Sequence, residues 1–122
     1  ERVLSGFKIE VTMQQHGQPT LCDHVITTVL MILDGIIQPG IFHVVRRDYV
    51  SRFEFAALIA DLLVPNRKEP IVSASQLIDQ EDKIRPKYSL LEPNQEILNF
   101  LFLERSSLEE EVELTLKRRN LK

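Results

Sequence analysis

The 122-residue sequence predicts an α+β fold that is mostly helical, with four to five helices and a small antiparallel strand pair near the N-terminus. Three observations support this fold class. Residues 7–13 alternate apolar and polar side chains, which is the period of a half-buried strand. Residues 52–63 have apolar side chains at helical spacing between a capping signal and a proline, and residues 93–120 have helical periodicity nearly to their end. A chain of this length fits one globular domain, residues 1–122, with its own core.

The first third of the sequence predicts one strand and one helix. In residues 7–13 the apolar side chains stand at every second position. A glycine and a proline separate this strand from residues 21–33, whose apolar residues suit a largely buried helix that Pro19 and Thr20 would begin. The β-branched residues of 21–33 leave a strand open as the alternative. Gly35 stands where a helix C-cap would place it.

A second strand is predicted directly after a turn. Pro39 and Gly40 occupy the second and third positions of a β-turn, where these residue types are favoured. Residues 41–45 follow as a short apolar run, and we expect them to pair with residues 7–13. This pairing would form the antiparallel strand pair near the N-terminus.

The helix with the clearest start and stop signals covers residues 52–63. Ser51 and Glu54 form a capping box, in which the hydroxyl accepts from the Glu54 amide and the carboxylate accepts from the Ser51 amide. Pro65 prevents the helix from continuing. We therefore expect a core helix at this position.

The segment that follows has weaker signals. Ser73 and Gln76 form a second capping pattern, which would start a short helix. Residues 81–94 are polar and broken by prolines, so we interpret them as an ordered loop or a flexible connector. Pro93 stands at a favourable first position for the next helix.

Residues 93–120 predict one long helix or two. Ser107 and Glu110 repeat the capping box and favour a restart there. Acidic residues 109–111 at the start and basic residues 117–119 at the end match the helix dipole, and we expect the carboxylates of residues 109–113 to form a solvated face. An apolar stripe on this helix would close the domain's own core or pack on another chain. The stripe consists of Ile97, Leu101, Leu108, Val112 and Leu116, with an interruption at Ser106 and Ser107.

Composition excludes several classes of function. Hydrophobic residues make up 43% and charged residues 27%, which is the usage of a globular rather than a disordered protein. The formal net charge of -3 gives no whole-domain attraction to nucleic acid or to an anionic membrane. No apolar run is long enough to span a bilayer. Because the chain starts without methionine, we expect a segment excised from a longer intracellular protein, cytoplasmic or nuclear.

Motifs of known catalytic and metal sites are missing. With one cysteine, Cys22, the chain can form neither an internal disulfide nor a thiolate zinc cage. Asp23 and His24 are adjacent and would point about 100° apart on a helix, so we interpret them as polar residues at a helix start. The four glycines form no phosphate-binding loop. We therefore predict that the chain is not an enzyme and has no catalytic residues, metal or cofactor.

Association with nucleic acid is an alternative function. Acidic residues separate the basic groups, and no aromatic stacking platform accompanies them, so we expect nucleic acid not to be the partner. A helix-rich fold would have to gather these groups on one face. The groups are Arg46 with Arg47, Arg67 with Lys68, then Lys83, Arg85 and Lys87, and finally residues 117–119.

A further alternative comes from a resemblance. The sequence GIIQPGIF, followed by VSRFEFAALIADLL, resembles the bacterial S-layer homology repeat, whose pattern has a GII turn, a GxF and a TRAEFAALLA helix. The resemblance covers about a quarter of the chain, and the spacings on both sides of Phe42 differ from the repeat. It implies anchoring to a cell-wall polymer, with Arg52 as the contact residue. The matching positions are Gly35, Ile36, Ile37, Gly40, Phe42, Val50, Ser51, Arg52, Glu54 and Phe55.

The leading hypothesis from the sequence is a non-enzymatic scaffold: a protein–protein interaction or dimerisation module of a larger protein. Its partner would be another protein or a second copy of the chain, without a membrane. Residues 93–120 would mediate self-association. The predicted partner-binding residues are Arg52 and Phe53 on one helix and Leu108, Val112 and Leu116 on another.

Overall fold

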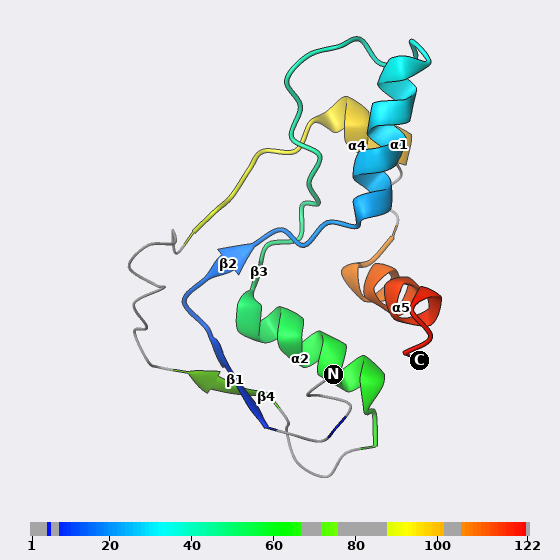
Figure 1. The fold of residues 1–122 in the computed structure, drawn as a ribbon. Helices are drawn as coiled ribbons and strands as arrows, with labels where there is room; N and C mark the ends of the chain where they lie inside the picture. Colours follow the sequence, from blue (N-terminus) through cyan, green and yellow to red (C-terminus); the bar gives the residue numbers. More distant parts are fainter. Residues whose placement is uncertain (1–4, 6–7, 67–71, 76–87, 102–105, 122) are drawn as a thin grey trace.

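The computed structural model of the chain describes residues 5, 8–66, 72–75, 88–101 and 106–121. Within these ranges the chain forms four helices and four short strands, and one strand pair near the N-terminus is antiparallel (Figure 1). The predicted α+β fold, mostly helical, is therefore confirmed.

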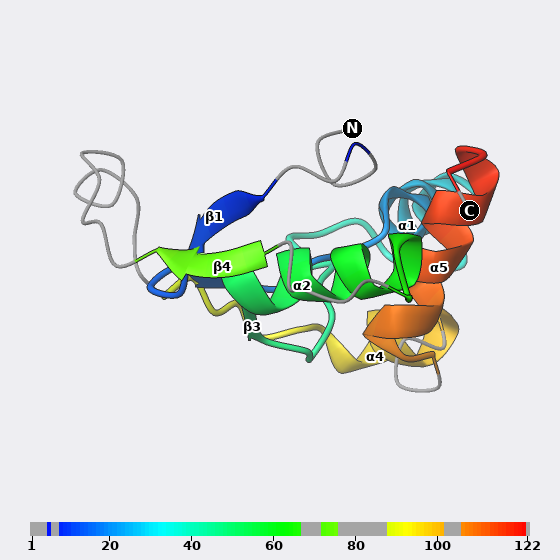
Figure 2. The ribbon, with the colours of Figure 1, turned by 90° about the horizontal axis from the view of Figure 1, so that it is seen from below.

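The longer strand pair is parallel. β1 (Ile9–Thr12) pairs with β4 (Val72–Ser75), with Ile9 opposite Val72. Parallel strands need a long crossover, and here α2 contacts both of them and covers one side of the pair (Figure 2). The predicted pairing of residues 41–45 with β1 is wrong, since 41–45 form no regular element and β1 takes a partner from much later in the chain.

The antiparallel pair leads directly into α2. β2 (His16–Gly17) pairs with β3 (Val50–Ser51), and α2 (Arg52–Leu63) begins at the next residue. Ser51 Oγ accepts from the Glu54 amide at 3.1 Å, and Glu54 Oε2 accepts from the Ser51 amide at 2.7 Å. The predicted capping box and helix bounds are confirmed. Hydrogen bonds to the Glu54 carboxylate from the backbone amide of Ser51 and, to a smaller extent, from its side chain favour the charged form and hold the pKa of Glu54 below its ordinary value.

α1 (Cys22–Leu33) confirms the helix expected over residues 21–33 and excludes the strand alternative. The helix ends in a Schellman motif: the Ile36 amide donates to the Met31 carbonyl at 2.9 Å, and Gly35 takes a positive φ of 75°. The expected burial is wrong, because Thr28 is the one buried residue of this helix. α1 packs against α4 at one end of the molecule (Figure 1), and ion pairs from its first turn reach α5.

The C-terminal part contains two helices, α4 (Gln95–Leu101) and α5 (Leu108–Arg118). The restart at Ser107 is confirmed by a complete capping box with Glu110. α4 begins two residues after the predicted Pro93, because Asn94 Oδ1 accepts from the Ile97 amide at 3.0 Å and caps the helix. Ser73 belongs to strand β4 rather than to a helix start, and the short helix expected after it lies outside the described residues.

The core is small and distributed over several elements. Its fully buried large side chains come from the loop after α1 and from α4, while Ala60 of α2 is 0% exposed. In the described part of the chain, no helix is long and apolar enough to cross a membrane. Among the residues that the structure describes, the buried apolar ones are Ile37, Ala60, Val72, Ile97, Leu98, Val112 and Leu116.

Candidate functional site

The structure separates the predicted partner-binding residues into two places. Arg52 begins α2 and donates from NH1 to Gln15 Oε1 at 2.8 Å, and Phe53 beside it is half-buried. The stripe of Leu108, Val112 and Leu116 instead faces α2, and Val112 and Leu116 are buried within the chain. The two groups do not form one surface.

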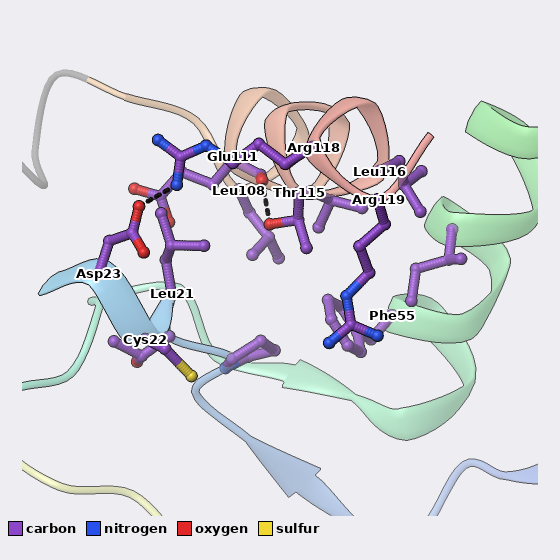
Figure 3. Close-up of a pocket in the computed structure, with 14 residues that line it drawn as sticks. Leu21, Cys22, Asp23, Phe55, Leu108, Glu111, Thr115, Leu116, Arg118 and Arg119 are labelled. Atoms are coloured by element: carbon purple, nitrogen blue, oxygen red, sulfur yellow. Dashed lines mark hydrogen bonds and ion pairs between the residues drawn. The ribbon is translucent and has the colours of Figure 1, made fainter. Parts of the chain in front are cut away.

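The stripe forms one wall of a cavity of about 380 Å³ between α5, α2 and the start of α1 (Figure 3). Phe55 and Ile59 lie one turn apart on α2 and provide the opposite apolar wall. The remaining sides come from residues 19–23, which lead into α1. The apolar walls are thus built from i, i+4 positions on two facing helices.

Two arginines at the end of α5 bring positive charge to this cavity. Arg118 NH1 forms an ion pair with Asp23 Oδ2 at the start of α1. Arg119 is the C-cap residue of α5, because Asn120 takes a positive φ of 54° and the Leu121 amide donates to the Leu116 carbonyl at 3.0 Å. Figure 3 shows the Arg119 side chain reaching from the end of α5 to the side of the cavity where Phe55 lies. Its guanidinium makes no hydrogen bond or ion pair with another described residue.

A buried group of charges is centred on Glu111 of α5. Glu111 Oε1 is 2.7 Å from His24 Nε2, 2.7 Å from Arg46 NH1 and 2.9 Å from Ser106 Oγ. The Arg46 NH1 contact is at ion-pair distance, although its N–H bonds are not directed at that oxygen. Arg46 also donates from Nε to Asp48 Oδ2 at 2.7 Å and from NH2 to the Ser106 carbonyl at 2.6 Å.

This charged cluster fixes the position of α5. Arg46 is 2% exposed and Glu111 is 7% exposed, so each needs the other as a compensating partner. Glu111 thereby joins α5 to α1 through His24 and to the loop before α2 through Arg46. Since Glu111 also lines the cavity, the same carboxylate sets the spacing of the cavity walls.

The three polar neighbours at the start of α1 have separate surroundings. Cys22 is exposed and lines the cavity, Asp23 pairs with Arg118, and His24 pairs with Glu111. In the described ranges, no three His, Cys, Asp or Glu side chains are placed to hold a metal ion.

Sequence reasoning missed Glu111 and Arg119. The interpretation of residues 109–113 as a solvated face holds for Glu109 and Glu110, which are exposed, and is wrong for Glu111, which is buried. A signal was present, since Glu111 lies three residues after Leu108 and so falls beside the apolar stripe. Arg119 carried no such signal, because its place depends on how the chain turns at Asn120.

Comparison with known proteins supplies the family. Residues 1–120 match the family model of the RmlD substrate binding domain. The dTDP-4-dehydrorhamnose reductase of Mycolicibacterium smegmatis (strain ATCC 700084 / mc(2)155) is 33% identical over 88 residues, covering 68% of this chain. The chain spans about a quarter of that relative, 25% of its length. No solved structure matches the chain.

These matches correct the functional hypotheses from the sequence. The prediction of a non-enzymatic interaction or dimerisation scaffold is wrong, as is the prediction that the chain is not an enzyme, because the matching family is named for substrate binding and the similar protein is a reductase. The nucleic-acid and S-layer alternatives are overturned by the same match; the S-layer resemblance covered about a quarter of the chain. The expectation of a protein partner stays a prediction. The match over residues 1–120 shows that the chain belongs to the RmlD substrate binding domain family.

Proposed function

We propose that this chain binds the nucleotide-sugar substrate of a reductase related to dTDP-4-dehydrorhamnose reductase, and that the cavity between α2 and α5 is the binding site. The observation that carries the proposal is the match of residues 1–120 to a substrate-binding family. The cavity supports the location, since about 380 Å³ lies in the range of small-molecule sites.

The cavity walls suit the sugar part of such a ligand. A dehydrorhamnose ring has apolar C–H faces and a methyl group, which pack against aromatic and aliphatic side chains. Phe55 and Ile59 on α2 and Val112 on α5 provide these surfaces. Thr20 and Thr115 also line the cavity. Their hydroxyls donate to the Gln18 and Glu111 carbonyls, and each can still accept a hydrogen bond from a sugar hydroxyl.

Arg119 suits the diphosphate part of the ligand. A guanidinium binds phosphate oxygens through two parallel N–H bonds. Arg118 is already paired with Asp23, whereas Arg119 lines the cavity without such a partner among the residues that the structure describes. Arg119 is therefore the cation assigned to the diphosphate.

The reduction step itself is not assigned to this chain. Reduction of a sugar ketone needs a hydride donor, and the four glycines of the sequence form no dinucleotide-binding loop. In this proposal the chain binds and orients the substrate, and the hydride donor is held elsewhere. A cytoplasmic location belongs to the same proposal and is supported by a single, exposed cysteine, which suits a reducing compartment.

A titration with dTDP tests the site. We expect dTDP to bind the chain in an NMR or calorimetric titration, and Arg119→Ala to weaken binding about tenfold or more through the lost charge-assisted hydrogen bonds. Lys117→Ala is the matched control, because it removes the same charge from the same turn of α5 without touching the cavity.

The titration distinguishes a wrong assignment of Arg119 from a wrong location of the site. An equal loss of affinity in Arg119→Ala and Lys117→Ala would reduce the contact to general charge attraction and contradict the assignment of Arg119. If dTDP leaves the spectrum of the wild-type chain unchanged at millimolar concentration, the cavity is not the site. Phe55→Ala should weaken a dTDP-sugar more than dTDP itself, since Phe55 is assigned to the sugar.

A further inference from the structure

α1 exposes an unusual amount of aliphatic surface. Leu33 is 76% exposed, and the sequence has no charged residue between His24 and Asp34. Polar groups therefore do not break up this surface, apart from two threonines, of which Thr28 is buried. We call it the α1 apolar face, and it consists of Val25, Ile26, Val29, Leu30, Leu33 and Ile36, each at least 45% exposed.

Such a surface is uncommon on a protein that functions without a partner. Large contiguous apolar patches on monomers mark interaction sites, and a helix that is apolar nearly all round is normally buried. Here α4 contacts one side of α1, and the apolar face remains uncovered in the described ranges. A partner for this face must itself be apolar, because the face offers no charge to pair.

The length of the similar reductase suggests a candidate partner for the α1 apolar face. The chain corresponds to 25% of the M. smegmatis reductase, so most of that polypeptide lies outside the matched region. We propose that the α1 apolar face docks against another domain of the same polypeptide, one with an apolar surface of its own. An uncharged, wholly aliphatic surface fits a permanent contact between domains better than a transient one, whose surface would be more polar.

The geometry permits docking without closing the cavity. α1 lies at the end of the molecule away from β1 and β4 (Figure 1). The cavity uses only Leu21, Cys22 and Asp23 near the start of α1, and the apolar face begins at Val25. A domain that covers the face would therefore stand beside the cavity entrance. This inference rests on the exposed face and the family, and it holds even if Arg119 does not bind phosphate.

Cysteine labelling tests the docking directly. In a Cys22→Ser background, Leu30→Cys reports on the apolar face, and Glu109→Cys on the exposed first turn of α5 is the matched control. We expect maleimide to react rapidly at both positions in the 122-residue chain. In the full-length polypeptide, we expect the rate at position 30 to fall at least about tenfold while position 109 is unchanged.

Each other outcome overturns the proposal. Equal rates at position 30 in the short chain and the full-length polypeptide would show that no other domain covers the face. Slow labelling in the short chain that dilution accelerates would assign the face to a second copy. Slow labelling that dilution leaves unchanged would assign it to another part of these 122 residues. A coding sequence that ends with this chain would also refute the docking. Circular dichroism of each variant confirms that the labelled proteins are folded.

Discussion

α1 and α2 are helices of the same length, twelve residues each, with opposite relations to the rest of the molecule. α2 begins with a capping box and packs against both β1 and β4 on one side and α5 on another. α1 has no side-chain cap, since its N-cap residue is Leu21, and it leaves most of its aliphatic side chains exposed.

In these two helices, the residues at which a helix ends and the extent to which it is buried have different causes. The bounds of a helix depend on residues within a few positions, such as Ser51 and Glu54 at the start of α2 or Gly35 after α1. Burial depends on which distant elements arrive at the helix. An apolar sequence shows that a helix needs a partner, but it does not show whether this chain provides one.

The largest effect is expected where buried charge joins α5 to the loop before α2. Arg46→Met would leave Glu111 buried without its cationic partner from the loop, and we expect the free energy of unfolding to fall by about 3–5 kcal/mol. Arg47→Met is the matched control, since Arg47 is exposed and its NH2 donates to Gln95 Oε1; it should cost less than about 1 kcal/mol. Urea denaturation followed by circular dichroism measures both. A loss no greater in Arg46→Met than in Arg47→Met would contradict the role of the charged cluster.

A smaller effect is expected inside α2. Ala60 is 0% exposed, so Ala60→Leu would force additional atoms into a filled space and should cost about 1–3 kcal/mol. On α1, Val29→Leu adds one methylene at a half-exposed position and should change stability by less than about 0.5 kcal/mol. Thermal unfolding of the two variants compares the helices directly. Equal melting temperatures would mean that α2 is no better packed than α1.

The bounds of the helices could be predicted from the sequence, whereas the pairing of the strands could not. Ser51, Glu54 and Pro65 fixed α2 because capping and proline effects act locally. Ser107 and Glu110 likewise predicted where α5 starts. Strand pairing was mispredicted, because β1 pairs with β4 about sixty residues later, and no local pattern encodes that register.

The sequence did not predict the cavity, but it indicated one of its walls. The spacing identified the stripe of Leu108, Val112 and Leu116 but left open whether it closes the domain's own core or packs on another chain, and in the structure it lines the cavity opposite α2. Glu111 and Arg119 were missed, since a carboxylate among other carboxylates and an arginine after a helix have no distinctive sequence signal. Their roles arise from His24 and Arg46, which lie far away in the sequence, and from the turn at Asn120.

Loss of the N-terminal cap of α2 should have a moderate effect on stability. Ser51→Ala removes the hydroxyl that accepts from the Glu54 amide, and we expect a loss of about 1 kcal/mol. The corresponding change in the cap residue of α1, Leu21→Ala, removes no cap bond, so any loss there must come from packing. Chemical denaturation measures the difference. A Ser51→Ala variant as stable as wild type would show that the strand β3, rather than the cap, fixes the start of α2.

The same cap predicts a dependence on pH. The pKa of Glu54 is lowered in the folded chain, so its contribution is fully present above the unfolded value of 4.5 and is lost as pH falls through the folded value. Glu54→Gln should therefore reduce the loss of stability on acidification below pH 4.5. Glu109→Gln, which removes a charge from α5 but no cap bond, is the control. If both variants keep the acid sensitivity of the wild type, Glu54 does not contribute to it.

The smallest effect is expected on the exposed side of α1, where it distinguishes a helix without a partner from one whose partner is missing. Leu33 is 76% exposed, so Leu33→Lys should change the unfolding free energy of the 122-residue chain by no more than about 0.5 kcal/mol while raising its solubility. Leu58→Lys on half-buried α2 is the control and should cost more. In the full-length polypeptide the same Leu33→Lys should become destabilising, because a charge would then be buried under the docked domain. Urea denaturation of both lengths decides the matter, since a neutral effect in both would mean that nothing covers α1.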